Sequence, residues 1–387
     1  MKNRTVAAVL VAAAGILLCT FPAATSAQSD TDAVRAMYQT SATVPTNIPG
    51  IRRFPDPPLG FDPVSASDIE LASYGFLPRP DAQADPNGYA RWVQSMKMAK
   101  HHWTGDLKET GKYHLPNQQA KVVAASTSGT TAGPNSTTSQ NWSGVILTNT
   151  LTKYSATTSF YLIESYFNVP FAQQAFTGDG NICDGLEDDV AVWNGIDGSG
   201  FGNGHAGDDD LLQAGVQATV TCTGGKTSTP KPYAWLEWYP GKEIHEFNVN
   251  TGDDMLVGTI ATSSTTGVIF LQDLTHQIYD TLDVTAPSGT ELVGTSAEWI
   301  VERTCCEGST SNTLPLANYI MEFTYGAEAT NTSNHYFYPS NQTATTYLST
   351  MLDGSNAISY PIAGLTGTEG NEGITYFEEG CAMTGGC

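Results

Sequence analysis

The sequence is poor in basic residues. Its 387 residues include 17 Lys and Arg against 39 Asp and Glu, which gives a formal net charge of -22. Because nucleic-acid binding depends on a basic surface that neutralises phosphates, this balance excludes a nucleic-acid partner. Charged residues make up only 14% of the chain and hydrophobic residues 40%, so the composition also excludes a disordered protein kept open by charge repulsion.

Long apolar runs are also scarce. One occurs, at positions 6–21, where it follows two basic residues and precedes small ones. This layout is typical of a secretory signal peptide, and we expect cleavage near Ala27. Residues 1–27 are then a signal peptide, and the protein is secreted and extracellular, without membrane contact after signal removal. A lipid anchor on Cys19 is the alternative, although Leu18 is larger than the residue that such a signal needs.

The usual catalytic signatures are missing. There is no G-x-S-x-G, which excludes a nucleophile elbow, and no Asp-Thr-Gly or Asp-Ser-Gly of a paired-carboxylate protease. His245-Glu246 begins like a zinc-protease helix, but Val249 stands where the second His is needed. We therefore expect no metal and no cofactor. Calcium binding is the alternative for two acidic clusters whose spacing matches no calcium loop, namely Asp184 with Glu187, Asp188 and Asp189, and Asp208 to Asp210.

Six cysteines remain once the signal peptide is removed: Cys183, Cys222, Cys305, Cys306, Cys381 and Cys387. An even number in an exported chain, without a C-x-x-C pair, predicts disulfides rather than zinc. Six cysteines permit 15 pairings, so the connectivity stays open. Cys305 and Cys306 are adjacent and are expected to reach different partners, because a bond between neighbours strains the backbone.

The charge is unevenly distributed along the chain. Residues 28–135 carry ten acidic and ten basic groups, whereas residues 136–387 carry 29 acidic and five basic groups. The neutral part contains Pro-rich stretches, one expected helix around Tyr89 to His101, and a Ser/Thr/Gly-rich linker at 126–140. It is predicted to be a mostly irregular pro-segment that docks on the acidic domain by charge. The alternative is an extension that stays attached.

The acidic part alternates apolar and polar residues as strands do. From Leu212 to Val220, every second residue is apolar and the residues between are Gln, Gly or Thr. Many such strands with turn-rich connections predict an all-β fold, an antiparallel β-sandwich of two large curved sheets of jelly-roll or lectin type. The expected strands are 159–169, 189–197, 211–220, 233–239, 255–262, 267–273, 297–303 and 318–325.

The polar faces of three strands hold the candidate site. Period-2 alternation places Trp193 with Asp197, Trp235 with Glu237, and Glu298 with Glu302 on one face of their strands, while the opposite faces are apolar. If the apolar faces form the core, the other faces together form a concave surface lined by Trp, Gln, Asp and Glu. A groove of this kind suits an extended polymer.

Five segments in order resemble the eqolisin, or glutamic peptidase, family: Asn141–Gly144, Val192–Gly198, Leu212–Val216, Ala234–Pro240 and Ala297–Glu302. The resemblance implies a β-sandwich and a secreted acid endopeptidase made with a removable pro-segment. It also implies a catalytic dyad of Gln213 and Glu298. Positions that line or support the family's cleft correspond to Trp142, Trp193, Asp197, Trp235 and Glu237.

The chemistry of this dyad suits peptide hydrolysis. Glu298 is expected to take a proton from water and return it to the leaving nitrogen, while the amide of Gln213 orients the water and stabilises the oxyanion. Since Gln213 is uncharged, nothing within the dyad raises the pKa of Glu298. The expected partners are protein or peptide substrates, and the enzyme is expected to be a monomer. The alternatives are a jelly-roll glycoside hydrolase using Glu237 and Glu298, or a carbohydrate-binding sandwich without turnover.

Overall fold

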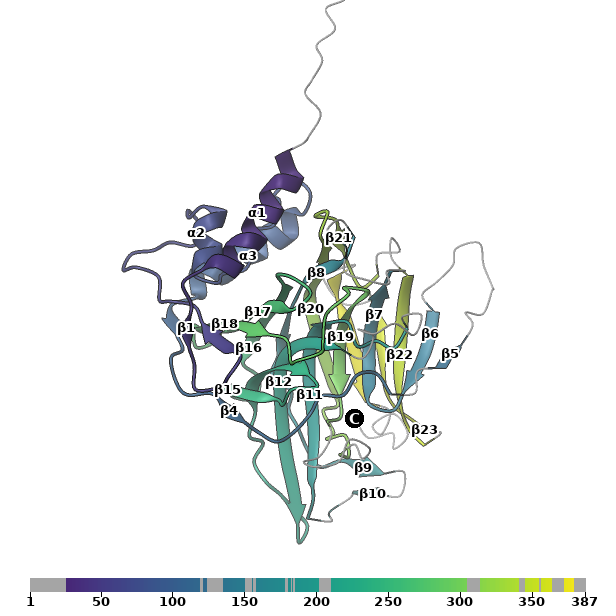
Figure 1. Ribbon diagram of the computed structural model, residues 1–387. Helices are drawn as coiled ribbons and strands as arrows, with labels where there is room; N and C mark the ends of the chain where they lie inside the picture. Colours follow the sequence, from purple (N-terminus) through teal and green to yellow (C-terminus); the bar gives the residue numbers. More distant parts are fainter. Residues whose placement is uncertain are drawn as a thin grey trace, which may run out of the picture.

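The computed structural model describes most of the chain after the apolar amino terminus (Figure 1). The residues it describes are 26–118, 121–123, 135–149, 155, 158–177, 180–181, 183, 185–201, 210–304, 314–340, 345–354, 356–363 and 372–378. Three helices lie in the amino-terminal part. The acidic part contains strands and no described helix, which confirms the all-β prediction for it. The helices are α1 (Ser26–Thr40), α2 (Asp68–Ser73) and α3 (Pro86–Met98).

The strands form two face-to-face layers of a β-sandwich. The first layer has the order β15 (Ile244–Asn248), β14 (Tyr233–Tyr239), β12 (Leu211–Thr223), β11 (Glu187–Ile196), β19 (Ser296–Glu302), β7 (Trp142–Thr148) and β22 (Thr345–Asp353). The second layer has the order β24 (Ile374–Glu378), β20 (Met321–Asn331), β8 (Phe160–Asn168), β16 (Asp254–Ala261), β17 (Thr266–Asp273), β18 (Ile278–Thr285), β2 (Ile51–Arg53) and β1 (Val44–Pro45).

The two layers are joined at one edge. Strand β23 (Asn356–Ala363) pairs with both β22 and β24, so hydrogen bonding continues from one layer into the other. The smaller strands are β3 (His101–His102), β4 (Lys108–Glu109), β5 (Lys121–Val123), β6 (Asn135–Ser139), β9 (Phe176–Thr177), β10 (Gly180–Asn181), β13 (Lys226–Thr227) and β21 (Tyr336–Phe337). All described strand pairs are antiparallel except β18 with β3 and β22 with β6.

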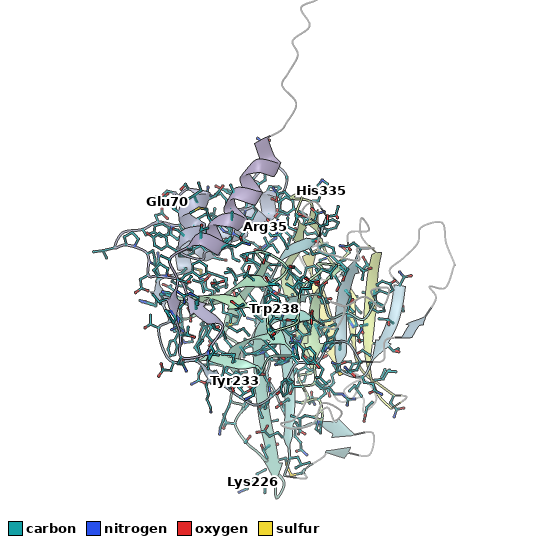
Figure 2. The ribbon with its side chains drawn as sticks, viewed as in Figure 1. Arg35, Glu70, Lys226, Tyr233, Trp238 and His335 are labelled. Carbon is teal, nitrogen blue, oxygen red and sulfur yellow. A yellow bond between two sulfur atoms is a disulfide. The ribbon has the colours of Figure 1, made fainter. Side chains whose placement is uncertain are left out.

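Alternation along the strands puts the predicted apolar faces between the layers. On β12, the residues from Leu212 to Val220 that the pattern assigned to one face all lie in the main core. Trp238 lies in the same core, near the middle of the molecule, while Lys226 marks the far tip of the hairpin that extends β12 (Figure 2). All eight predicted strands are present. The pattern missed β7, β15, β18, β22, β23 and β24.

The amino-terminal part is more ordered than the sequence predicted. The expected helix at Tyr89–His101 is present as α3 but starts earlier, because the Asp85 side chain accepts a hydrogen bond from the Gly88 amide and Pro86 fits the first turn. Helices α1 and α2 were not predicted, although most of residues 28–118 lie outside helices and strands, as expected. The apolar faces of these short helices are buried because they pack against the outer face of the second layer.

That outer face is covered by a second apolar core. It contains Leu71, Phe76 and Trp92 from the helical part, packed with Leu256 and Phe270 of the second layer among others. Beyond α3 the chain pairs with the sheet edges through β3 and β4. It then crosses the outer face of the first layer. The amino-terminal part therefore contacts the outer faces of both layers of the sandwich.

One disulfide lies within the described residues. It joins Cys183 to Cys222 on β12, with the two Cα atoms 4.7 Å apart. The expectation of disulfides is met for this pair. The other four cysteines of the exported chain lie outside the described residues, as does most of the signal peptide.

Candidate active site

Gln213 and Glu298 lie in one row across the outer face of the first layer. Gln213 on β12 and Glu298 on β19 are both register partners of Gly195 on β11, and Glu237 on β14 is the next partner of Gln213. Register partners in antiparallel strands point to the same face, so the row reads Glu237, Gln213, Gly195, Glu298. The two dyad candidates are separated by two strand spacings, roughly 10 Å of backbone, and Gly195, the strand residue between them, has no side chain.

The tryptophans form the next rows of the same face. Trp235 and Trp193 are both register partners of Gly215. Trp142 packs edge-on against Trp193, with the ring centroids 5.0 Å apart and the planes at 77°. The indole of Trp193 donates to Glu302 at 2.8 Å. The three tryptophans therefore lie on the same surface as Gln213, Glu237 and Glu298, as the alternation indicated.

Asp197 has a different environment from the other predicted residues. It follows β11 with a positive φ of 69°, and its carboxylate accepts bonds from the amides of Val293, Gly294 and Thr295 at 2.7 to 2.8 Å. Burial raises the pKa of Asp197 to about 6, although these bonds act in the opposite direction. Asp197 therefore fixes the loop that enters β19, two residues before Glu298.

A segment of the amino-terminal part lies directly on this surface. We call residues 110–118 the strap. The Gln213 amide donates to the carbonyl of His114 at 3.0 Å, and the amide of His114 donates to Glu237 at 2.8 Å. Trp142 donates through its indole to the carbonyl of Leu115 at 3.0 Å. The concave surface predicted to be an open groove is therefore occupied, and its seven predicted site residues are all buried.

The side chain of His114 fills a pocket beside the dyad row. Its ring lies flat on the indole of Trp235, with centroids 3.5 Å apart and planes within 4°. Nδ1 lies 2.9 Å from Glu302 and Nε2 lies 2.6 Å from Glu243. Burial alone lowers the pKa of His114, but these two carboxylates outweigh it and raise the pKa to about 10. The ring is therefore an imidazolium.

Glu298 is held from its own strand. The hydroxyl of Ser296 donates to Oε1 of Glu298, and Oε2 has no hydrogen-bond partner among the described residues. Burial raises the pKa of Glu298 well above its usual value, and nearby Asp197 raises it further. The sequence argument concerned only charge within the dyad. Gln213 adds no repulsion, but burial and Asp197, which lie outside that argument, raise the pKa.

Sequence reasoning did not find His114, Glu243 or Ser296. The strap has no strand alternation, and Glu243 lies in the bend between β14 and β15, where periodicity carries no information. His114, one of three histidines in the neutral segment, gave no signal of its own. Only the path of the strap brings His114 and Glu243 together.

The expectation of no metal and no cofactor stays a prediction. The one group of described His, Cys, Asp and Glu side chains with metal-like spacing is Asp253, Asp273 and His276. Asp253 directly precedes β16, Asp273 ends β17 and His276 follows it in the turn to β18, so none of the three belongs to the dyad row. Of the two acidic clusters considered for calcium, Asp189 instead binds Lys112 and Gln217, while Asp184, Asp208 and Asp209 lie outside the described residues.

The sequence matches one family model and a curated protein. The family model described as "Peptidase A4 family" matches residues 121–360. Aspergillopepsin-2 of Aspergillus niger is 26% identical over 214 residues, which cover 51% of this chain and 67% of that protein.

Two solved structures are similar in part. Scytalido-glutamic peptidase with a transition state analog inhibitor is 20% identical, with a TM-score of 0.46, covering 62% of this chain and 98% of that one. Aspergilloglutamic peptidase from Aspergillus niger is 24% identical, with a TM-score of 0.39, covering 49% of this chain and 99% of that one.

Proposed function

The chain belongs to the peptidase A4 family and is a glutamic-type endopeptidase, and from this premise we propose that it hydrolyses peptide bonds with Gln213 and Glu298. We further propose that it is secreted, acts in acidic surroundings as a monomer, and is made as a zymogen whose residues 28–135 are a pro-segment. Its substrates are proteins or peptides.

One observation supports the dyad most directly. The amide NH2 of Gln213 donates to a peptide carbonyl, that of His114, at 3.0 Å. This is the contact that an oxyanion-stabilising amide makes with the carbonyl of a bond to be cut. Glu298 lies in the same row on the other side of Gly195, where it can hold a water against the carbonyl carbon.

The reaction follows from these positions. Departure of the strap exposes Glu298 to water and relieves the burial that raises its pKa. The ionised carboxylate then takes a proton from a water molecule, and the water oxygen bonds to the carbonyl carbon. The C=O electron pair moves to the oxygen, which the Gln213 amide stabilises. When the intermediate collapses, the C–N bond breaks and Glu298 returns the proton to the nitrogen. The products are a carboxylic acid and an amine.

The remaining predicted residues support the dyad in two ways. Glu237 accepts the backbone amide of His114, so it positions an extended chain next to Gln213. Trp142 and Trp235 contact the strap, and Trp193 holds Glu302. We assign Asp197 a positioning role through the loop that precedes Glu298.

Charge contacts support the pro-segment. Basic residues before position 136 pair with acidic residues after it at three separate places. These pairs are Arg53 with Asp280 at 2.7 Å, Arg91 with Glu372 at 2.5 Å, and Lys112 with Asp189 at 2.8 Å. While the strap covers the dyad, a substrate is excluded.

Secretion rests on the amino-terminal sequence. The signal-like run precedes Ala27, and α1 begins at Ser26, next to the expected cleavage point. Among the residues that the structure describes, no helix is long and apolar enough to span a membrane.

The test uses the full chain and a denatured protein substrate at about pH 3 to 5, where a carboxylate of ordinary pKa still ionises in part. The chain should release peptides and shorten itself near the linker at 126–140. Glu298→Gln and Gln213→Ala should each abolish both activities, with a loss of at least about 100-fold. Matched controls are Glu291→Gln and Gln173→Ala, which make the same changes at exposed sites. Full activity in either dyad variant contradicts the assignment.

A further inference from the structure

The outer faces of the two layers differ in chemistry. On the first layer, β12 turns Gln213 and Gln217 outward, where both side chains donate hydrogen bonds. On the second layer, β16 and β17 turn apolar side chains outward, among them Leu256, Ile260 and Phe270, while the alternate residues of both strands lie in the main core. Strands that are apolar on both faces are typical of sheets covered on both sides. The second layer is therefore built to stay covered.

The amino-terminal part covers this face with a compact unit. We call residues 28–103, which contain α1 to α3 and β1 to β3, the cap (Figure 1). Phe76 of the cap lies against Phe270 and Tyr279, with ring centroids 6.1 and 5.3 Å apart. If the cap left, the bare face would exceed the few hundred Å² of contiguous apolar surface that a monomeric protein usually presents. The cap buries nine side chains of the sandwich, namely Tyr161, Leu162, Tyr166, Leu256, Ile260, Val268, Phe270, Leu274 and Tyr279.

The backbone of the cap extends the second layer. Strand β2 pairs with β18 from Ile51 to Arg53, and β3 pairs with β18 at His101 and His102. Without these partners, β18 would be an open edge strand with unpaired N–H and C=O groups. Arg53 also binds Asp280 of β18 at 2.7 Å, and the carboxylate of Asp280 has no exposed surface. The contact thus combines strand pairing, a buried ion pair and an apolar core.

One glycine of the sandwich fits a side chain of the cap. Gly258 lies inside β16, where glycine weakens a strand and often marks a close approach of another segment. A Cβ atom at this position would stand 2.4 Å from Cδ2 of Leu77. The absent side chain therefore makes room for Leu77, which is fully buried against the sheet.

The strap is held in a different way from the cap. Its contacts are the hydrogen bonds and ion pairs of Lys112, His114 and Leu115, and no strap residue belongs to an apolar core among the described residues. Water replaces hydrogen bonds at a small net cost, whereas apolar surface stays unfavourable in water. The strap can therefore leave the dyad while the cap remains on the second layer.

We propose that the cap is a permanent part of the active enzyme and stays bound to the outer face of the second layer after the linker at 126–140 is cut. This inference rests on the proposed function, which supplies the cut. The pro-segment is then cut but retained, and only its strap moves away from the dyad. Residues 28–135 contain no cysteine, so no disulfide joins the cap to the sandwich, and the contact described above holds it.

The first experiment does not depend on the proposed activity. A recognition site for an unrelated, site-specific protease is inserted into the linker of the Glu298→Gln chain, which cannot cut itself under the proposed function. After cutting with that protease, the two fragments should elute together from a size-exclusion column in acidic buffer and separate only in denaturant. Elution of the sandwich without the cap overturns the inference.

A second experiment asks which contact holds the fragments together. In the cut chain, Phe76→Ala should raise the dissociation constant of the fragments about 100-fold or more, because it empties the core between cap and sheet. Phe171→Ala, the same change at an exposed position of the sandwich, should leave it unchanged, and His114→Ala in the strap should change it far less. If His114→Ala releases the fragment as readily as Phe76→Ala, the strap holds it and the inference fails.

The parent chain links the result to activity. After it has cut itself in acid, the fraction that cleaves a denatured protein should contain the cap and the sandwich in equal amounts. Full activity in a fraction that holds only the sandwich overturns the inference and leaves the peptidase standing. A parent that cuts neither itself nor any substrate overturns the proposed function, while the cut Glu298→Gln chain still shows whether the cap stays bound.

Discussion

Gln213 and Glu298 are the two register partners of one residue, Gly195, so they face each other across a strand position that has no side chain. The space above Gly195 is where the proposed water and the carbonyl carbon must meet. A methyl group there would stand 3.0 Å from Leu211 and Trp193, which also makes it a tight fit.

Replacing this glycine tests the space directly. Gly195→Ala should lower kcat/KM about tenfold or more, because the added methyl group intrudes between the dyad side chains. The same methyl group should also lower the free energy of unfolding, by about 1 to 3 kcal/mol, because it overpacks the site. Peptide cleavage and the thermal unfolding midpoint are measured together. A variant with unchanged kcat/KM would show that the reacting atoms do not lie above Gly195.

Asp197 is expected to be structural. Its two oxygens accept the amides of Val293, Gly294 and Thr295. Asp197→Asn replaces one acceptor oxygen with a donor, so it should lower the free energy of unfolding by about 2 kcal/mol or more. Asp106→Asn, an exposed aspartate, should change it little. If Asp197→Asn unfolds as the parent does but has lost activity, Asp197 acts in the chemistry instead.

Lys112 is expected to set how readily the strap leaves. It pairs with buried Asp189 at 2.8 Å and with Glu187 at 3.1 Å. Lys112→Met removes the cation and leaves Asp189 buried with fewer donors, so the strap should bind less tightly. The full-length variant should shorten itself faster and at a higher pH than the parent, as followed by electrophoresis. Lys97→Met, the same change at an exposed position of α3, serves as the control. Equal rates for both variants would contradict the role of this ion pair.

Folding stability should be greatest in acid. Burial raises the pKa of Glu164 to about 7 and the pKa of Glu378 to about 7. In the folded chain these groups keep protons that the unfolded chain has lost. The stability they contribute is fully present below the ordinary carboxyl pKa and is lost as the pH rises through about 7.

The unfolding midpoint measures this effect. It should fall by roughly 5 °C or more between about pH 4.5 and about pH 7.5. Glu164→Gln removes one of the titrating groups and should flatten the dependence, whereas Glu291→Gln should not. A midpoint that rises over this range would show that the paired carboxylates, whose contribution has the opposite sign, dominate instead.

The sequence by itself determined most of the sandwich domain. Strict alternation identifies which face of a strand is buried, and this placed Gln213, Glu298, Trp193, Trp235 and Glu237 on one surface before any coordinates. The physical reason is local: each residue's side of a strand follows from its position in the strand.

The tertiary structure decided what lies on that surface. His114 meets Glu243 and Glu302 across 129 and 188 residues of sequence, and no periodicity links them. Helices α1 and α2 are ordered by the apolar face of the second layer, which local sequence does not encode. The closing of the strap over the dyad depends on the path of the whole amino-terminal part around the sheet edge. Long-range packing and paired charges, rather than any local pattern, therefore hold the strap over the dyad.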